Sequence, residues 1–230
     1  MRILVIKLSS LGDIAHALPA VRALKERTGA EIDWAVQPEY AALLACCPDV
    51  ARTIAFPRRG FFRNLFPFLR ELRRARYDVI VDLQGLMKSA LAARLARGGK
   101  RLGPAWAREG SRWLYTAQPP RRNGPRRHAV EELMDVVALV APGDSRPPEP
   151  QLKFPEAESN GSPGPHVALA PFSRWPTKNW PLEKFAELGR RLAAEMGCQI
   201  RIVGGPENFA QVEELAGRIG SGARNLCGKT

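Results

Sequence analysis

The chain has 230 residues, 45% of them hydrophobic, and a formal net charge of +12. This length allows one large or two small domains with a sizeable core, and no apolar run approaches the roughly 20 residues of a membrane span. The amino terminus lacks the small-residue cleavage site of a secretory signal. The four cysteines form no CxxC pair and no zinc spacing, which favours buried thiols in a reducing cytosol.

The positive charge predicts an anionic partner, such as nucleic acid, a phosphorylated lipid surface or a phosphorylated sugar. Much of the excess is arginine, which binds phosphate and carboxylate groups in a bidentate manner. The same arginines could instead only solvate the outer faces of helices, and composition does not separate these interpretations. Because the chain contains no RNA- or DNA-binding motif, nucleic-acid binding ranks last.

The first 25 residues predict a strand, a polar turn and a helix. Residues 2–7 form a near-continuous apolar run, as in a strand buried on both faces of a parallel sheet. Ser9, Ser10 and Gly12 lie in the turn, and a helical pattern follows Asp13. Ligands of open α/β sheets bind at the carboxyl ends of strands, so this turn is a candidate site.

Asp13 is the candidate general base. The dipole and free N–H groups of a helix amino terminus stabilise its ionised form, and a carboxylate there can accept a proton from a bound hydroxyl. Gly12 leaves backbone room beside it, and His16 lies one helical turn further along. The alternative is that the polar residues only turn the chain and cap the helix.

The chain up to residue 141 continues this alternation, which predicts one doubly wound parallel sheet. Strands are expected at residues 31–37, 52–56, 77–84 and 100–103. Helices are expected at residues 39–46, 61–76, 86–97 and 128–141. The helix after residue 60 interleaves aromatic and basic residues, with a kink expected at Pro67. It is either an interfacial helix facing anionic lipid or an ordinary amphipathic helix with a cationic outer face.

Residues 142–165 are rich in Pro, Gly, Ser and Glu and are expected to form a linker between a domain at 1–141 and a second at 166–230. The second segment predicts strands at 166–172 and 199–203 and the start of another at 225–227, with helices at 181–197 and 207–219. Because sheets usually have several strands, two βα units suggest a piece of a longer chain.

Four stretches together resemble the lipopolysaccharide heptosyltransferases of glycosyltransferase family 9: KLSSLGDIAHALPA, YDVIVDLQGLMKSALAARLA, RHAVE and SRWPTKNWP. The similarity extends from Met1 to the end of the chain. It implies a GT-B fold with two Rossmann-like domains, the first complete and the second begun. It also implies an inverting, metal-independent transferase that uses ADP-heptose and no further cofactor. The paired serines are most similar to members that add the first heptose to Kdo.

The resemblance assigns roles residue by residue. Asp13 matches the proposed catalytic base for the Kdo hydroxyl. Positions matching the acceptor side of the cleft are Ser9, Ser10, Gly12, Arg58, Arg59, Arg63, Lys88, Arg108 and His128. Positions matching the donor side are Ser173, Lys178 and Glu207, of which Lys178 would reach the donor diphosphate. No clustered carboxylates or His pair suggest a metal site.

The implied partner is Kdo-lipid A at the cytoplasmic face of the inner membrane, with a peripheral, monomeric enzyme. The family's later Asp-Thr-Gly motif does not occur in these 230 residues, so weak or absent turnover is expected of this chain. Two alternatives stay open. The chain could be a non-catalytic phosphate- or nucleotide-binding module at an anionic surface, or a family member with another acceptor, such as heptose.

Overall fold

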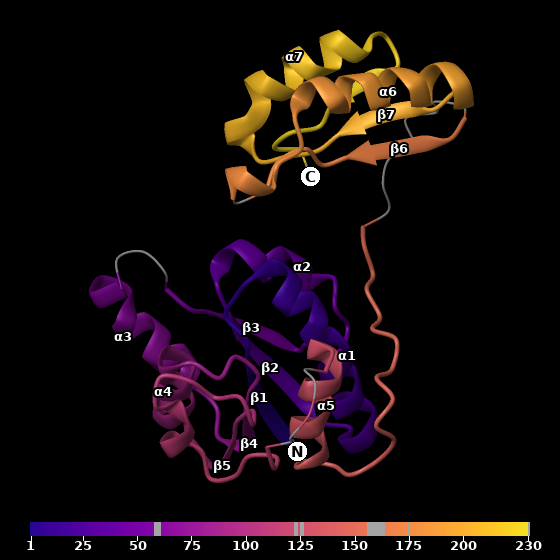
Figure 1. The fold of residues 1–230 in the computed structure, drawn as a ribbon. Coiled ribbons are helices and arrows are strands. Elements are labelled where there is room, and N and C mark those ends of the chain that lie inside the picture. Colours follow the sequence, from indigo (N-terminus) through magenta and orange to yellow (C-terminus); the bar gives the residue numbers. More distant parts are fainter. Residues whose placement is uncertain (58–60, 122–123, 125–126, 156–163, 174, 230) are drawn as a thin grey trace. The chain divides into compact units, whose positions relative to one another are not determined.

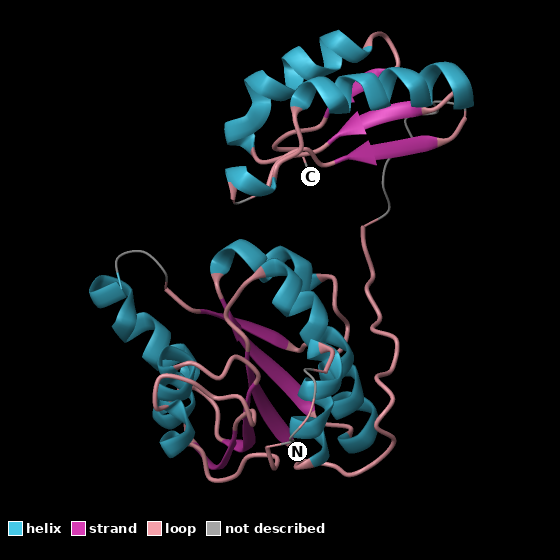
Figure 2. Cartoon of the chain, in the orientation of Figure 1, coloured by secondary structure: helices cyan, strands magenta, loops and turns pink. Residues whose placement is uncertain are grey.

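The computed structural model describes the chain except for residues 58–60, 122–123, 125–126, 156–163, 174 and 230. The chain divides into two compact units, Met1–Pro155 and Glu156–Thr230. Each has its own parallel sheet and its own core (Figures 1 and 2). The expected α/β fold class is confirmed.

The sheet of the first unit has five parallel strands in the order β3-β2-β1-β4-β5. The strands are β1 (Arg2–Ile6), β2 (Glu31–Val36), β3 (Arg52–Ala55), β4 (Tyr77–Asp82) and β5 (Gly98–Leu102). Strands β1, β2 and β4 are buried on both faces, which explains their near-continuous apolar sequences. The strand order reverses direction between β1 and β4, and such a switch point opens a crevice at the carboxyl ends of the strands.

Two helix layers cover this sheet (Figure 2). On one face, α1 (Leu11–Thr28), α2 (Ala41–Ala45) and α5 (Ala129–Ala138) pack on side chains such as Ile3, Val5 and Trp34. On the other, α3 (Phe61–Leu72) and α4 (Met87–Leu95) pack on Leu4, Ile6 and Ile80. Short 3-10 helices lie at η1 (Pro38–Tyr40) and η2 (Ser111–Leu114).

The second unit contains three parallel strands in chain order: β6 (His166–Leu169), β7 (Gln199–Ile202) and β8 (Ala223–Asn225). Helices α6 (Leu182–Met196) and α7 (Phe209–Ile219) pack on it around Ile200, Ile202 and Val212. The 3-10 helices η3 (Pro176–Lys178) and η4 (Pro206–Asn208) follow the carboxyl ends of β6 and β7.

Several expected boundaries were wrong. The helix expected at 39–46 divides into η1 and α2, and helix α3 ends at Leu72, four residues before its expected end. Strands β5 and β8 begin two residues earlier than expected, at Gly98 and Ala223. Pro181 is the residue before α6 instead of its first helical position.

The expected linker at 142–165 is in part packed against the first unit. Leu152 contacts the core beneath α1 and α5, and the Lys153 N–H donates to the Cys46 carbonyl over 2.7 Å. The division between the units falls after Pro155. Composition alone misses this arrangement, because only a few contacts hold the described part of the segment: Leu152, the Lys153 N–H and the Arg27 guanidinium, which donates to the Asp144 carbonyl.

Candidate active site

A cavity of about 510 Å³ lies at the switch point, where β1 and β4 end. Its lining comes from the β1–α1 connection, the first turns of α1, the β4–α4 connection, the loop before η2, and α5. The lining residues are Lys7, Asp13, His16, Gln84, Gly85, Leu86, Trp106, Arg108, Ala129, Glu132 and Leu133. All of these residues belong to the first unit.

Asp13 lies in the first turn of α1, three residues after the N-cap residue Ser10. Its Oδ2 accepts hydrogen bonds from the Ser10 backbone N–H and hydroxyl, both at 2.9 Å. Among the described residues, nothing donates to Oδ1. One carboxylate oxygen therefore holds the turn, and the other is available to a bound hydroxyl at the cavity.

The pKa of Asp13 lies below the ordinary 3.8. Partial burial opposes this shift, but the two hydrogen bonds from Ser10 outweigh it, with help from the charges of Lys7 and His16. Asp13 is therefore ionised at neutral pH. It caps the helix and also presents a carboxylate to the cavity, so its capping role is compatible with its role as the candidate general base.

Lys7 is a site residue that the sequence analysis missed. Lys7 directly follows β1, and its side chain is only 7% exposed and donates from Nζ to the Leu83 carbonyl over 3.0 Å. Burial lowers the pKa of its ammonium, while the negative charges of Asp13 and Asp82 raise it. The available signal was a lysine that closes an apolar strand immediately before a polar turn, where a buried cation needs an anionic partner.

Gln84 fixes the backbone that leads to Asp13. Its Oε1 accepts from the N–H groups of Leu8 and Ser9 at 3.1 and 3.3 Å. Beneath it, the fully buried Asp82 accepts from the N–H groups of Gln84 and Gly85 and from the Tyr115 hydroxyl. Burial raises the pKa of Asp82 against these hydrogen bonds. The end of β4 thus positions the turn after β1.

Arg108 reaches the same cavity from the loop before η2. Its backbone N–H donates to the Gly85 carbonyl over 2.9 Å, which ties this loop to the β4–α4 turn. Gly85 has φ +73°, and a Cβ there would come within 2.7 Å of Pro104, so the turn requires glycine. Arg108 is exposed and adds a cation to a site that already contains Lys7.

His128 is the N-cap of α5, with Nδ1 accepting from the Val130 N–H over 3.3 Å. Its ring meets that of His16 edge to face, with centroids 5.3 Å apart. Helix α5 also contributes Glu132 to the cavity, a carboxylate that the sequence analysis did not select. Only the packing of α1 against α5 brings these residues together.

The other predicted acceptor residues lie elsewhere. Lys88 on α4 and Arg63 on α3 are exposed and do not line this cavity. A Cβ at Gly12 would meet no atom within 4 Å, so the space beside Asp13 is open. Arg58 and Arg59 lie outside the described residues.

The predicted donor residues follow the carboxyl ends of strands in the second unit. The Ser173 hydroxyl, in the loop after β6, donates to the Trp175 carbonyl over 2.8 Å. Lys178 ends η3, is exposed, and has no ion pair within the described parts of the chain. Glu207 lies in η4 after β7, with its carboxylate beside Gly205.

Across the residues that the structure describes, no group of three or more His, Cys, Asp or Glu side chains is placed to hold a metal ion. None of the described helices combines the length and apolar character needed to cross a bilayer.

Fold and cavity together define a doubly wound α/β protein with a charged ligand site at its switch point. The family model for glycosyltransferase family 9 (heptosyltransferase) matches residues 65–230, and the chain belongs to this family. The lipopolysaccharide heptosyltransferase 1 of Pseudomonas aeruginosa is 33% identical over 98% of this chain and 66% of its own length. The chain therefore spans about two thirds of that relative.

Solved structures agree with this placement and with the expected GT-B fold type. The structure described as E. coli heptosyltransferase WaaC with ADP has a TM-score of 0.78 and 28% identity, covering 98% of this chain and 74% of that one. The same enzyme with ADP-2-deoxy-2-fluoro heptose has a TM-score of 0.79 and 26% identity, covering 98% and 76%.

Proposed function

We propose that this chain takes part in inverting glycosyl transfer, moving heptose from ADP-heptose to a Kdo hydroxyl of the lipopolysaccharide inner core. The observation that carries the proposal is the ionised Asp13, with one oxygen available at a charged cavity. Family membership supports the reaction class. The name of the Pseudomonas relative supports a lipopolysaccharide acceptor, and the ADP and ADP-sugar ligands of the E. coli structures support the donor.

The proposed step is a single displacement. The acceptor oxygen forms a bond to the anomeric carbon, while the bond between that carbon and the ADP oxygen breaks. The acceptor proton passes to Asp13, and Lys178 compensates the charge that develops on the departing diphosphate. No covalent enzyme intermediate is needed, because one displacement inverts the configuration.

Within this step, Lys7 and Ser10 set the properties of the base. Both lower the pKa of Asp13, which keeps it ionised but makes it a weak base. Proton transfer is therefore expected late, when the acceptor oxygen has become acidic through bonding to the anomeric carbon. Arg108 lines the same cavity, and we assign it to an anionic group of the acceptor because a Kdo carboxylate and a phosphate both fit a guanidinium.

The test is heptose transfer from ADP-heptose to Kdo-lipid A, followed by mass spectrometry. Asp13→Asn retains the shape and one acceptor oxygen but cannot take the proton. We expect kcat to fall by about 10²-fold or more, as is typical for loss of a general base. Asp144→Asn, at an exposed carboxylate paired with Arg146, is the matched control and should leave kcat unchanged.

Acceptor binding is measured on the same variants by calorimetry. If the chain is a non-catalytic anion-binding module, Asp13→Asn leaves acceptor binding equal or tighter, and no transfer is seen even with a version extended to the length of the relatives. That result would contradict the proposal. Equal transfer rates for the unaltered chain and Asp13→Asn would contradict it as well.

A further inference from the structure

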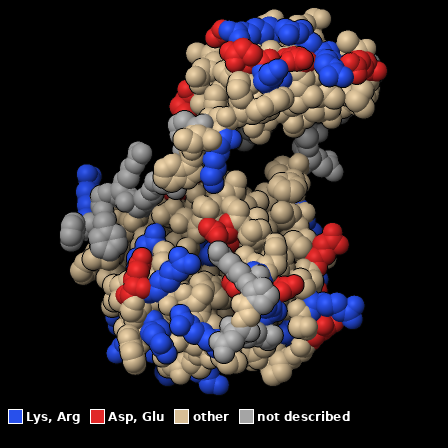
Figure 3. Space-filling view, viewed as in Figure 1, with Lys and Arg blue, Asp and Glu red and all other residues tan. Residues whose placement is uncertain are grey.

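The two helix layers of the first unit differ in charge. Residues 61–76 and 87–97, which contain α3 and α4, carry eight Arg or Lys residues and one acidic residue, Glu71. Helices α1 and α5 carry three basic and five acidic residues. In Figure 3, basic side chains gather over the region of α4 and β5, whereas both signs mix over α1 and α5. A large share of the chain's positive charge therefore lies in one layer.

Helix α3 combines this charge with exposed apolar surface. Phe68 and Leu72 point into the core and are 5% and 0% exposed, while Phe66 is 84% exposed. Phe66, Leu69, Arg70 and Arg73 line a shallow hollow of about 440 Å³. The spacing of Phe66, Arg70 and Arg73 places them on one outward stripe, since residues four and seven apart share a helix face.

Helix α4 repeats the pattern. Its alanines 92, 93 and 96 are buried against the core that α3 also covers. Leu91 and Leu95 on its outer side are 46% and 42% exposed, with Arg94 between them. The outward stripes of both helices therefore belong to one layer. We call this surface the α3–α4 face: Phe66, Arg70, Arg73, Leu91, Arg94 and Leu95.

The arginines of the α3–α4 face are not used within the protein. Arg70, Arg73 and Arg94 make no side-chain hydrogen bond or ion pair with any residue that the structure describes. In the opposite layer, by contrast, Arg22 pairs with Glu26 and Asp49 at 2.7 and 3.1 Å. Unpaired guanidinium groups beside exposed Phe and Leu side chains leave both kinds of group to an external partner.

We propose that the α3–α4 face binds the surface of a bilayer that contains anionic phospholipid. Phe66, Leu91 and Leu95 enter the boundary between headgroups and acyl chains, and the three arginines bind lipid phosphates. Nucleic acid would use the arginines but gives no reason for the exposed Phe and Leu. A second copy of the face is disfavoured because its like charges repel.

This contact does not depend on the transferase reaction. It complements that reaction, because a lipid-linked acceptor is reached only at a membrane surface. Arginine provides attraction that salt weakens, while the apolar residues provide attraction that salt does not weaken. Binding should therefore require both kinds of residue.

The test is co-sedimentation of the full chain with vesicles of phosphatidylethanolamine and phosphatidylglycerol, and with vesicles of phosphatidylcholine alone. We expect binding to the anionic vesicles only. Arg70→Gln/Arg73→Gln/Arg94→Gln should lower partitioning by about 10²-fold, since each arginine near an anionic surface contributes roughly fivefold. Phe66→Ser should lower it about tenfold, and Phe66→Leu should restore most of the loss.

Matched controls distinguish the effect of this face from the effects of net charge and of exposed apolar surface elsewhere. Arg146→Gln/Arg191→Gln/Arg224→Gln removes the same charge elsewhere, and Phe154→Ser removes an aromatic side chain that is 65% exposed outside the face. Both controls should bind like the unaltered chain. Equal losses in the two triple variants, or no effect of Phe66→Ser, would overturn the proposal. So would tighter binding to duplex DNA than to anionic vesicles, or a dimer that Phe66→Ser dissociates.

Discussion

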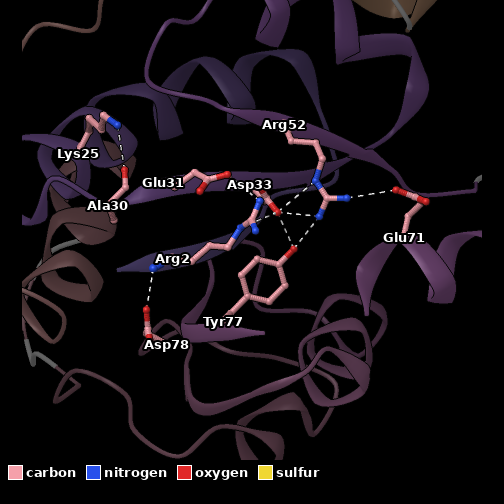
Figure 4. A network of polar contacts seen from close by, with 9 residues as sticks. All are labelled: Arg2, Lys25, Ala30, Glu31, Asp33, Arg52, Glu71, Tyr77 and Asp78. Carbon is pink, nitrogen blue, oxygen red and sulfur yellow. Dashed lines mark hydrogen bonds and ion pairs between the residues drawn. The ribbon is translucent and has the colours of Figure 1, made fainter. Parts of the chain in front are cut away.

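Two aspartates of the first unit lie near opposite edges of the same sheet, one at a cavity and the other fully buried. Asp13 follows β1 at the carboxyl edge, lines a cavity and keeps one oxygen available. Asp33 lies in β2 and is fully buried. Its partners Arg2, Arg52 and Tyr77 are the first residues of β1, β3 and β4, which places this network toward the amino edge (Figure 4).

The network around Asp33 serves the fold. Its Oδ2 accepts from the Arg52 guanidinium and the Tyr77 hydroxyl, both at 2.7 Å, and lies 3.6 Å from Arg2 Nε. Arg52 also pairs with Glu71 of α3. The cluster thus joins the four strands β1, β2, β3 and β4 to helix α3. In doubly wound sheets, ligands bind at the carboxyl edge. We therefore attribute the polar network at the amino edge to the stability of the fold.

The largest expected effect follows from removing the buried charge. Asp33→Asn removes the buried anion that Arg52 and Arg2 share and leaves them only their exposed partners Glu71 and Glu31. The loss of one partner of a buried pair typically costs about 3 to 5 kcal/mol. Partial exposure of both arginines places the expected loss toward the lower figure. Urea unfolding followed by circular dichroism measures it.

Tyr77→Phe is the graded control for that measurement, because it removes one donor to Asp33 and keeps every charge. It should cost about 1 kcal/mol. If Asp33→Asn proves no more costly than Tyr77→Phe, the network is not the electrostatic tie described above. Acceptor binding at the cavity should be unchanged in both folded variants.

A substitution of Lys7 tests the electrostatic surroundings of Asp13 at the carboxyl edge of the sheet. Lys7→Met keeps the apolar stem but removes the cation that lowers the pKa of Asp13. The Asp13 pKa should rise, while the larger contributions of the two hydrogen bonds from Ser10 remain. Carbon-13 NMR titration of the Asp13 carboxyl measures this without requiring turnover. An unchanged titration would show that Lys7 does not act on the base.

The matched control for this experiment is Lys25→Met. Lys25 lies on the same helix as Asp13 but donates to the Ala30 carbonyl at the far end of α1. The Lys25→Met variant should leave the titration of Asp13 unchanged. A shift of similar size in both variants would mean that net charge, and not the position of Lys7, controls Asp13.

The sequence predicted the parts of this picture that depend on local pattern. The apolar runs of β1 and β4 and the polar turn before Asp13 were sufficient to expect a parallel sheet and a site at its carboxyl edge. Strand β5 was placed less well because GGKRL has no apolar pattern. Gly98 belongs to it for a packing reason, since a Cβ there would come within 2.7 Å of the Tyr77 carbonyl oxygen.

Residues whose roles depend on strand order were not predictable in this way. Lys7 and Asp82 interact because β1 and β4 are neighbours, although 75 residues separate them in the chain. The partners of Asp33 likewise come from three other strands. Sequence periodicity predicts strands but not their neighbours, so the residues that support Asp13 appear only when the sheet is assembled.

The smallest expected effect concerns how the stability contributions of two carboxylates of the site, Asp13 and Asp82, change with pH. The pKa of Asp13 is lowered in the folded state, so its contribution to stability is present above the ordinary value of 3.8 and is lost as pH falls through the folded value. The pKa of Asp82 is raised by burial, so its contribution is present below 3.8 and is lost as pH rises through its folded value. Unfolding free energies of Asp13→Asn and Asp82→Asn, each subtracted from that of the unaltered chain across this range, should therefore change with pH in opposite directions. Parallel pH profiles would show that the hydrogen bonds from Tyr115 and the β4–α4 turn fully compensate the burial of Asp82, and the two carboxylates would then be electrostatically alike.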